Sequence, residues 1–286
     1  MIVDSQIHVW AAETPDRPWP AERMSHPQRS APFLPSDALC EMDAAGVAGA
    51  VLVPPTWEGD RNDLALAAAR AHPGRFTVMG RLALDAPDAR DLVAGWRDHP
   101  GLSGFRLTFH TPALRRHLDD PSASWLWRSL EDSGAPVMIS VSGMARALQP
   151  VAERYEGLRI AVCHLARPIG GQDEAGFADL DDLLALSRFA HVSVKASATP
   201  CNTRDAYPFP RVQRHLLRVR DHFGAERIFW GSDLTRLPCT YRQCIDLFAE
   251  ALPGLSEPER AQILGRSLCR WLNWTPTSPG SGARSP

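Results

Sequence analysis

The sequence predicts an α/β protein folded as a single-domain, closed (β/α)8 barrel, the TIM barrel. Short apolar runs rich in Val, Ile and Leu alternate repeatedly with amphipathic stretches. Continuous apolar strands separated by helices of ~10–15 residues are typical of a parallel sheet covered on both faces. The competing fold, an open doubly wound sheet, usually carries a glycine-rich phosphate loop after its first strand. No G-x-G-x-x-G or Walker-type motif occurs here.

Eight segments have the composition of buried strands, which is the number a closed barrel of this kind requires. Each is a short apolar run followed by polar or turn-forming residues. The predicted strands are residues 2–7, 48–53, 76–82, 104–108, 136–141, 159–164, 192–196 and 227–231.

The segments between these strands carry helix signals. Ser36 precedes Asp37 as an N-cap residue would, and Asp60 opens a run in which small and apolar residues recur at helical spacing. Glycines such as Gly46 and Gly134 follow predicted helices, as expected for left-handed C-caps. The remaining predicted helices are residues 86–98, 123–133, 144–155, 179–189, 210–223 and 241–251.

Two parts lie outside the strand–helix repeat. Residues 11–35 form a proline-rich segment too long for a routine connection, so we expect a lid or an active-site rim. A helix over residues 257–272, followed by Trp274, is expected to pack across the barrel exterior. The predicted domain therefore spans residues 1–274, and residues 275–286, rich in Pro, Gly and Ser, are expected to be disordered.

Composition excludes several classes of partner. The 286 residues include 31 Lys and Arg against 33 Asp and Glu, a formal charge of −2, and no basic run stands out. Nucleic acid and anionic membranes are therefore not expected partners. The longest apolar stretch, residues 44–53, is too short to span a bilayer, and the N-terminus lacks the features of a secretory signal. We expect a cytoplasmic protein with its six scattered cysteines reduced.

Polar side chains occupy the ends of the predicted strands, where barrel enzymes place their catalytic groups. His8 and His164 end strongly apolar strands, and Asp233 follows another. A buried carboxylate near two imidazoles indicates a metal site or an acid–base site, or else a structural hydrogen-bond network. The other strand-end residues are Gln6, Pro54, Trp57, Arg81, Arg106, His110, Ser140, Ser142 and Lys195.

Three motifs resemble the amidohydrolase superfamily, specifically its amidohydrolase-2 branch of lactonases and related hydrolases and decarboxylases. Residues 4–10, DSQIHVW, resemble the first-strand Asp-x-His-x-His signature. Residues 162–168, VCHLARP, resemble the sixth-strand His motif, and residues 230–233, WGSD, resemble the eighth-strand motif. Residues 194–197, VKAS, are similar to the seventh-strand segment. The resemblance runs from residue 2 to about residue 274 and implies a metal-dependent barrel hydrolase.

The sequence departs from the family pattern at the metal ligands. Gln6 stands where the first metal-binding histidine would be, and the fifth predicted strand ends without a histidine. The resemblance leaves His8, His164 and Asp233 as ligands of one divalent zinc ion, with Gln6 a weak amide donor. Three ligands suffice for a catalytic zinc, and metal-independent catalysis stays open as the alternative.

The resemblance implies hydrolysis of a lactone or similar cyclic ester. Asp233 is the expected general base, and the carbonyl is polarised by zinc on His8 and His164 or, without metal, by His8, His164 and Lys195 as hydrogen-bond donors. Four further residues are expected to bind a small anionic substrate: Arg81, Arg106, His110 and Arg236.

Several alternatives stay open at this stage. Trp10, Trp57 and Tyr207 form either an apolar wall for a substrate ring or ordinary core and rim packing. A decarboxylase or hydratase of the same branch would use the same Asp and His residues. A barrel that has lost catalysis and binds a small molecule is the third reading, with Gln6 as its main support. The sequence also leaves open whether the chain forms a homo-oligomer.

Overall fold

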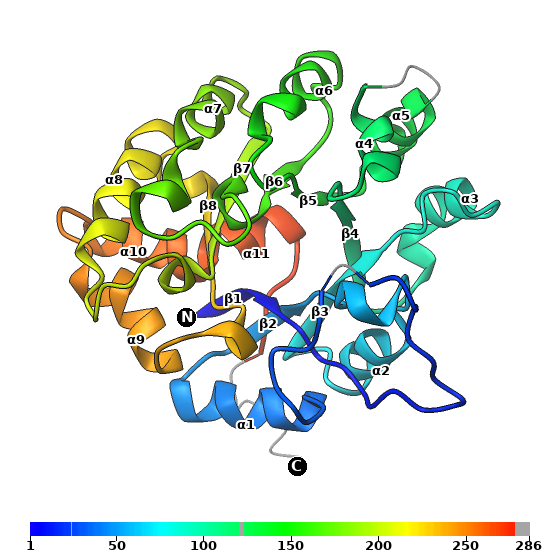
Figure 1. Cartoon of the computed structure of the whole chain (residues 1–286), viewed down its shortest axis with the longest axis horizontal. Coiled ribbons are helices and arrows are strands. Elements are labelled where there is room, and N and C mark those ends of the chain that lie inside the picture. The colour runs from blue at the N-terminus through cyan, green and yellow to red at the C-terminus, as the bar shows by residue number, and fades with distance from the viewer. Residues whose placement is uncertain (24, 120–122, 278–286) are drawn as a thin grey trace, which may run out of the picture.

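The structure, a computed structural model, describes residues 1–23, 25–119 and 123–277 and contains the predicted barrel (Figure 1). Eight parallel strands pair in chain order, and all eight predicted strands are confirmed to within two residues at each end. The strands are β1 (Val3–Ile7), β2 (Gly49–Leu52), β3 (Phe76–Arg81), β4 (Leu102–Thr108), β5 (Val137–Ser140), β6 (Ile160–Val162), β7 (Val192–Ser197) and β8 (Ile228–Gly231).

The seam between β8 and β1 is joined by hydrogen bonds at the buried Asp4. The N–H of Asp233 donates to the carbonyl oxygen of Gln6 at 3.0 Å. The Asp4 carboxylate accepts from the main-chain N–H of Gln6 and of Ser232, each at 2.9 Å, and from the Tyr241 hydroxyl at 2.7 Å. Burial raises the pKa of Asp4, and these hydrogen bonds oppose the rise. Asp4 thus connects the first and last strands of the barrel.

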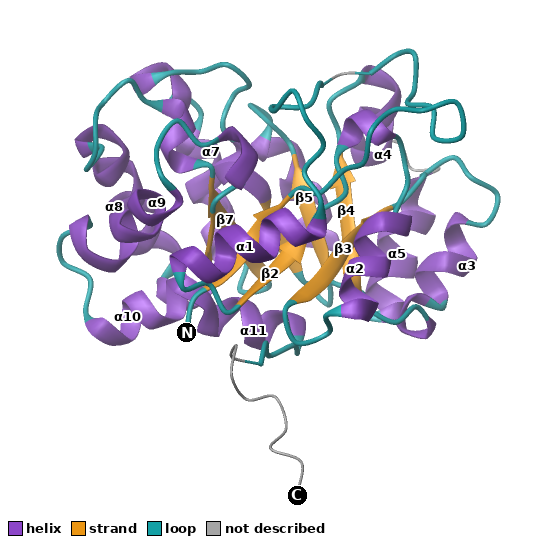
Figure 2. Ribbon diagram, turned by 90° about the horizontal axis from the view of Figure 1, so that it is seen from below, coloured by secondary structure: helices purple, strands orange, loops and turns teal. Residues whose placement is uncertain are grey.

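Helices surround the strands and cover their outer face (Figures 1 and 2). Several predicted helices, such as residues 86–98 and 144–155, are divided into a short α-helix and a 3-10 turn. No helix within residues 1–23, 25–119 and 123–277 is long and apolar enough to cross a membrane. The helices of the ring are α1 (Pro35–Ala45), α2 (Asp63–Ala71), α3 (Ala89–Ala94), α4 (Pro112–Asp119), α5 (Ser124–Ser133), α6 (Gln149–Arg154), α7 (Leu180–Leu184), α8 (Pro210–Phe223) and α9 (Tyr241–Asp246).

Two details of the helix prediction need correction. The N-cap of α1 is Leu34, not Ser36, because Pro35 takes the first helical position and the Asp37 carboxylate accepts from the Leu34 N–H at 2.8 Å. Helix α4, which follows β4 directly, was not among the predicted helices. This helix begins at a proline and is mostly exposed, so it lacks the broad apolar stripe that identifies a buried helix.

The C-terminal helix, whose predicted range of residues 257–272 is confirmed, closes one end of the barrel. It consists of α10 (Glu257–Ala261), a π-helical segment (Gln262–Arg266) and α11 (Ser267–Leu272), with a kink at Gly265. A Cβ atom at Gly265 would lie 3.1 Å from the carbonyl oxygen of Met1, so the close approach of the N-terminus favours glycine there. In Figure 2, α11 lies beneath the strands. Leu268 and Leu272 join a buried cluster with Phe229 inside the barrel.

The described part of the C-terminal tail lies against the barrel. The Thr277 N–H donates to the Gly74 carbonyl oxygen at 2.9 Å, and the Trp274 indole N–H donates to the Pro73 carbonyl oxygen at 3.1 Å. Residues 278–286, the larger part of the tail that we expect to be disordered, lie outside the described residues.

Candidate active site

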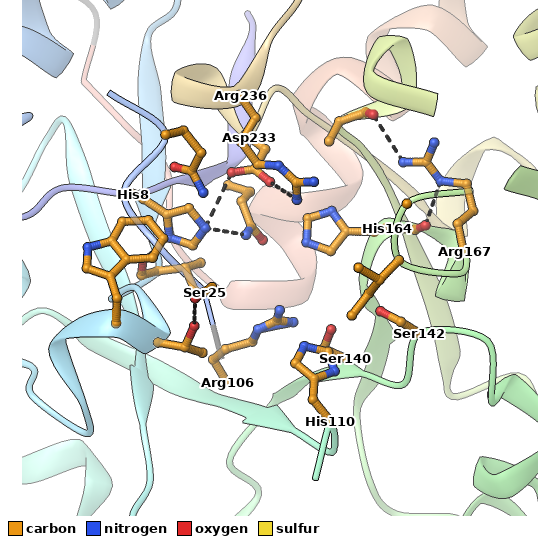
Figure 3. A pocket seen from close by; sticks show the side chains of 18 of the residues that line it. His8, Ser25, Arg106, His110, Ser140, Ser142, His164, Arg167, Asp233 and Arg236 are labelled. Atoms are coloured by element: carbon orange, nitrogen blue, oxygen red, sulfur yellow. Dashed lines mark hydrogen bonds and ion pairs between the residues drawn. The ribbon is translucent and has the colours of Figure 1, made fainter. Parts of the chain in front are cut away.

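A cavity of about 340 Å³ opens at the C-terminal ends of the strands and gathers most of the predicted site residues (Figure 3). Ser25 and Gln28 of the long segment after β1 also line it, so that segment contributes to the rim. Arg17 anchors the segment by donating to the buried Glu58 at 3.0 Å and to Asp63 at 2.6 Å. The predicted site residues that line the cavity are Gln6, His8, Trp57, Arg81, Arg106, His110, His164, Asp233 and Arg236, and the strand-end residues Pro54, Ser140 and Ser142 line it as well.

Two predicted site residues, Trp10 and Lys195, do not line the cavity. Trp10 is 1% exposed and packs edge-on against Trp57, with ring centroids 5.3 Å apart. Of the two alternatives, Trp10 is therefore a core residue, and its ring packs against Trp57 on the side away from the cavity. Lys195 is fully buried and donates to the Gln6 side-chain oxygen at 2.5 Å. Tyr207, the third candidate for an apolar wall, is 37% exposed and also lies outside the lining.

His8 is held from both sides of its ring. Its Nδ1 lies 2.6 Å from the Val53 carbonyl oxygen, which can only accept, so Nδ1 carries a hydrogen. Its Nε2 lies 3.2 Å from the Gln6 side-chain nitrogen and 3.3 Å from Asp233 Oδ1. Burial lowers the pKa of His8, and the nearby Asp233 opposes that shift. A neutral His8 then carries its lone pair on Nε2, so in this tautomer it does not donate to a substrate carbonyl.

Asp233 presents one carboxylate oxygen without a hydrogen-bond partner. The residue is 1% exposed, and its Oδ2 accepts from Arg236 at 3.3 Å. Its Oδ1 makes no hydrogen bond and faces the electron-rich Nε2 of His8. A buried carboxylate oxygen in this position readily accepts a proton from a bound water or substrate.

His164 is oriented by two residues outside the predicted set, Ser197 and Arg167. Its Nδ1 lies 2.9 Å from the Ser197 hydroxyl, and its backbone has a φ of 53°, in the left-handed region. Arg167 donates to the carbonyl oxygens of His164 at 2.9 Å, Ser197 at 3.0 Å and Ala198 at 3.1 Å. Burial lowers the pKa of His164 well below its usual value, and the cationic Arg106 and Lys195 lower it further. Arg167 follows His164 by only three residues, and this proximity is the sequence signal that could have identified Arg167 as a residue of the site.

Positive charge dominates the rest of the cavity wall. The Arg106 side chain is 7% exposed, and its Nη1 has no hydrogen-bond partner. Arg81 pairs with Asp60 at 3.1 Å. Burial, together with Arg106 and Arg81, lowers the pKa of His110 to about 4, so this ring is neutral near pH 7. An unpaired, buried guanidinium is suited to bind a carboxylate.

Polar groups gathered at the C-terminal ends of barrel strands define an enzyme of the (β/α)8 class. Residues 3–266 match the amidohydrolase family, and the chain belongs to that family. It is a hydrolase, and the resemblance seen in its strand-end motifs is confirmed.

Relatives cover nearly the whole chain. An L-fucono-1,5-lactonase from Burkholderia ambifaria is 27% identical over 94% of both chains. A putative 2-pyrone-4,6-dicarboxylic acid hydrolase from Pseudomonas putida is 26% identical, with a TM-score of 0.71 over 95% of this chain and 97% of that one. An amidohydrolase from Burkholderia multivorans, solved with bound zinc, has the same fold at 21% identity, with a TM-score of 0.78 over 96% of this chain and 99% of that one.

The residues of this chain do not fit the three-ligand zinc site that the family resemblance implies. Catalytic zinc sites typically use three protein ligands and a water. Among the described residues, no group of three His, Cys, Asp or Glu side chains is placed to hold a metal ion. His8 and Asp233 do lie together, but the Gln6 oxygen already accepts from the Lys195 ammonium. A zinc ion on His8, His164 and Asp233 therefore stays a prediction without support from this geometry.

Proposed function

We propose that this protein opens a small lactone or similar cyclic ester that carries a carboxylate. The observation that carries the proposal is the buried Asp233 Oδ1, which lacks a hydrogen-bond partner in a cavity with a cationic wall. The names of the Burkholderia ambifaria and Pseudomonas putida relatives, a lactonase and a putative pyrone dicarboxylate hydrolase, support the substrate class.

In the proposed reaction, Asp233 acts as the general base. Its Oδ1 takes a proton from water while the water oxygen forms a bond to the lactone carbonyl carbon. The bond from that carbon to the ring oxygen then breaks, and Asp233 returns the proton to the leaving oxygen. The products balance as one hydroxy acid from one lactone and one water.

Arg106 and His164 are the donors best placed to stabilise the developing oxyanion and the substrate anion. Arg106 Nη1 is buried and unpaired, and the His164 ring lies across the cavity from His8 in Figure 3. Donors fixed in a buried site lower the barrier without having to reorganise as charge develops. Arg236 sits beside Asp233, where its 3.3 Å contact orients the carboxylate.

Replacing Asp233 tests the general base. We expect Asp233→Asn to reduce kcat by on the order of 10²- to 10⁴-fold, because an amide cannot accept the proton. A panel of neutral and carboxylated lactones, followed by proton release and mass spectrometry of the product, measures ring opening. Asp181→Asn, which removes a surface carboxylate paired with Arg218 on α8, is the matched control. Full activity in Asp233→Asn would remove the general-base assignment, and carbon dioxide release would indicate a decarboxylase instead.

Replacing Arg106 tests the charge of the substrate. A hydrogen bond to a charged group contributes roughly 1.5–3 kcal/mol, so Arg106→Ala should raise KM for a carboxylated lactone by on the order of 10- to 100-fold. The exposed Arg70 on α2 provides the control variant Arg70→Ala. Comparing carboxylated and neutral lactones of one ring size separates lost charge recognition from general damage. An unchanged KM for the carboxylated lactone contradicts this role of Arg106.

A further inference from the structure

The side chain of Gln6 is fully engaged by two neighbours. Lys195 Nζ lies 2.5 Å from the amide oxygen, and His8 Nε2 lies 3.2 Å from the amide nitrogen. An ammonium group has donors and no acceptor, so the amide oxygen must face Lys195 and the NH₂ group must face His8. Both Gln6 and Lys195 are 0% exposed, so water does not offer the amide another arrangement.

The hydrogen bonds of His8 agree with this orientation. Its Nδ1–H donates to the Val53 carbonyl oxygen, which leaves Nε2 with the lone pair that accepts from Gln6. The donors therefore run in one direction, from Lys195 to Gln6, from Gln6 to His8 and from His8 to Val53. Reversing any link would bring two donors or two acceptors together in a buried place, at a cost of about 1–3 kcal/mol.

This series of hydrogen bonds determines whether His8 can donate a hydrogen bond to Asp233. An imidazolium at His8 would direct an Nε2–H at the Gln6 NH₂ group, and Lys195 prevents that amide from turning over. His8 therefore makes no hydrogen bond to Asp233 Oδ1 despite the 3.3 Å separation. The same arrangement occupies the Gln6 oxygen and the His8 lone pair, the two atoms that a metal ion at this end of β1 would need.

We propose that Lys195 and Gln6 are positioning residues that take the place of a bound metal ion. They hold His8 as the neutral Nδ1–H tautomer, and so leave the Asp233 Oδ1 atom free to accept a proton. Only the use of that atom as the base of lactone hydrolysis rests on the proposed function. The tautomer of His8 and the lack of a metal ion on it are properties of the protein without substrate.

The tautomer can be measured directly by NMR of protein labelled with ¹⁵N-histidine at pH 7.0. We expect the wild-type His8 ring, assigned by its loss in His8→Asn, to show a protonated Nδ1 and an unprotonated Nε2. In Gln6→Glu the introduced carboxylate accepts from both sides, so the His8 Nε2 signal should shift to the protonated position. Gln149→Glu, at the start of α6, should leave the His8 signals unchanged. A wild-type His8 that is protonated at Nε2 would overturn the proposal, whether or not the Gln6 variant folds.

Zinc binding provides the second test. Wild type and His8→Asn are each equilibrated with zinc chloride, passed through a desalting column and analysed for bound zinc. We expect the two proteins to retain equal amounts, because the His8 lone pair is occupied by Gln6. Roughly one additional equivalent of zinc in wild type, lost in His8→Asn, would overturn the proposal. Neither measurement uses a lactone, so failure of the proposed substrate class would leave both results interpretable.

Discussion

At the scale of single residues, the chemistry of this site depends on which buried polar atoms have partners and which do not. Asp233 Oδ1 and Arg106 Nη1 have no hydrogen-bond partner, whereas the polar atoms of Gln6 are both engaged. Residues of similar burial therefore differ in function. In the proposed reaction the unpartnered atoms contact water and substrate, whereas the engaged ones set the orientation of their neighbours.

His110 gives a prediction at this scale. Its folded-state pKa is about 4, below the ordinary value of 6.5, because burial and the nearby arginines oppose protonation. The unfolded chain therefore binds more protons than the folded one between these values, and stability falls as pH drops from 6.5 to 4. The contribution of one such group is at most about 1.4 kcal/mol per pH unit.

Thermal melting of wild type and His110→Asn across this pH range measures the effect. The variant, neutral at every pH, should lose less stability on acidification. The pKa values of His8 and His164 are also lowered by burial, so some acid sensitivity remains in the variant. Identical pH dependence in the two proteins would contradict a neutral, buried His110.

At the scale of elements, the turns that follow β6 and β8 orient the side chains of the site. His164 and Asp233 have φ values of 53° and 55°, a region that costs residues other than glycine some strain. In the turn after β6, Arg167 offsets this backbone strain by donating hydrogen bonds to carbonyl oxygens at the ends of both β6 and β7. Its removal would leave those buried acceptors unsatisfied.

Arg167→Met should therefore loosen this turn and lower kcat as well as stability. We expect a loss of about 3 kcal/mol or more in the free energy of unfolding and faster hydrogen exchange over residues 163–171. Arg227 makes the matched control, because it donates to the carbonyl oxygens of Ser187, Phe189 and Val192 near the opposite end of β7. Arg227→Met should lose similar stability and keep its kcat. Equal kcat in both variants would show that Arg167 does not position the site.

At the scale of the whole molecule, the barrel has one open end and one closed end. The cavity opens at the C-terminal ends of the strands, and α11 covers the other end (Figure 2). The apolar interior between them includes Val3, Met79 and Phe229, all at most 1% exposed. The C-terminal helix is therefore part of the core, although it follows the last strand–helix unit.

Leu268→Ala tests this role of α11. Leu268 is fully buried, and removing a buried leucine side chain typically costs about 2–5 kcal/mol. Thermal and denaturant unfolding measure the loss, and kcat below the melting temperature should be retained because the site lies at the other end. Leu34→Ala, at a residue 41% exposed before α1, should change stability by less than about 0.5 kcal/mol. A similarly small effect of Leu268→Ala would mean that α11 does not close the core.

The barrel, its strand order and the polar residues that end the strands all follow from the amino-acid sequence. Strand periodicity and helix punctuation are local properties, and the eight strand ends of a parallel barrel necessarily face one side. The sequence alone therefore indicates that His8, His164 and Asp233 lie at one end of the barrel, where they line the cavity. Two features cannot be recognised from the sequence. Helix α4 is exposed and therefore has a weak apolar pattern, and the kink at Gly265 depends on a close approach of the backbone of residues distant in the chain.

How these residues are used depends on the tertiary structure. Gln6 and Lys195 are 189 positions apart in the chain, and no local pattern shows that an ammonium orients that amide toward His8. Trp10 and Trp57 are both tryptophans that follow a strand by a few residues, yet of the two only Trp57 lines the cavity. Side-chain partners depend on long-range packing and on the direction of each donor and acceptor. That is why the strand-end residues were predictable and their hydrogen-bond partners were not.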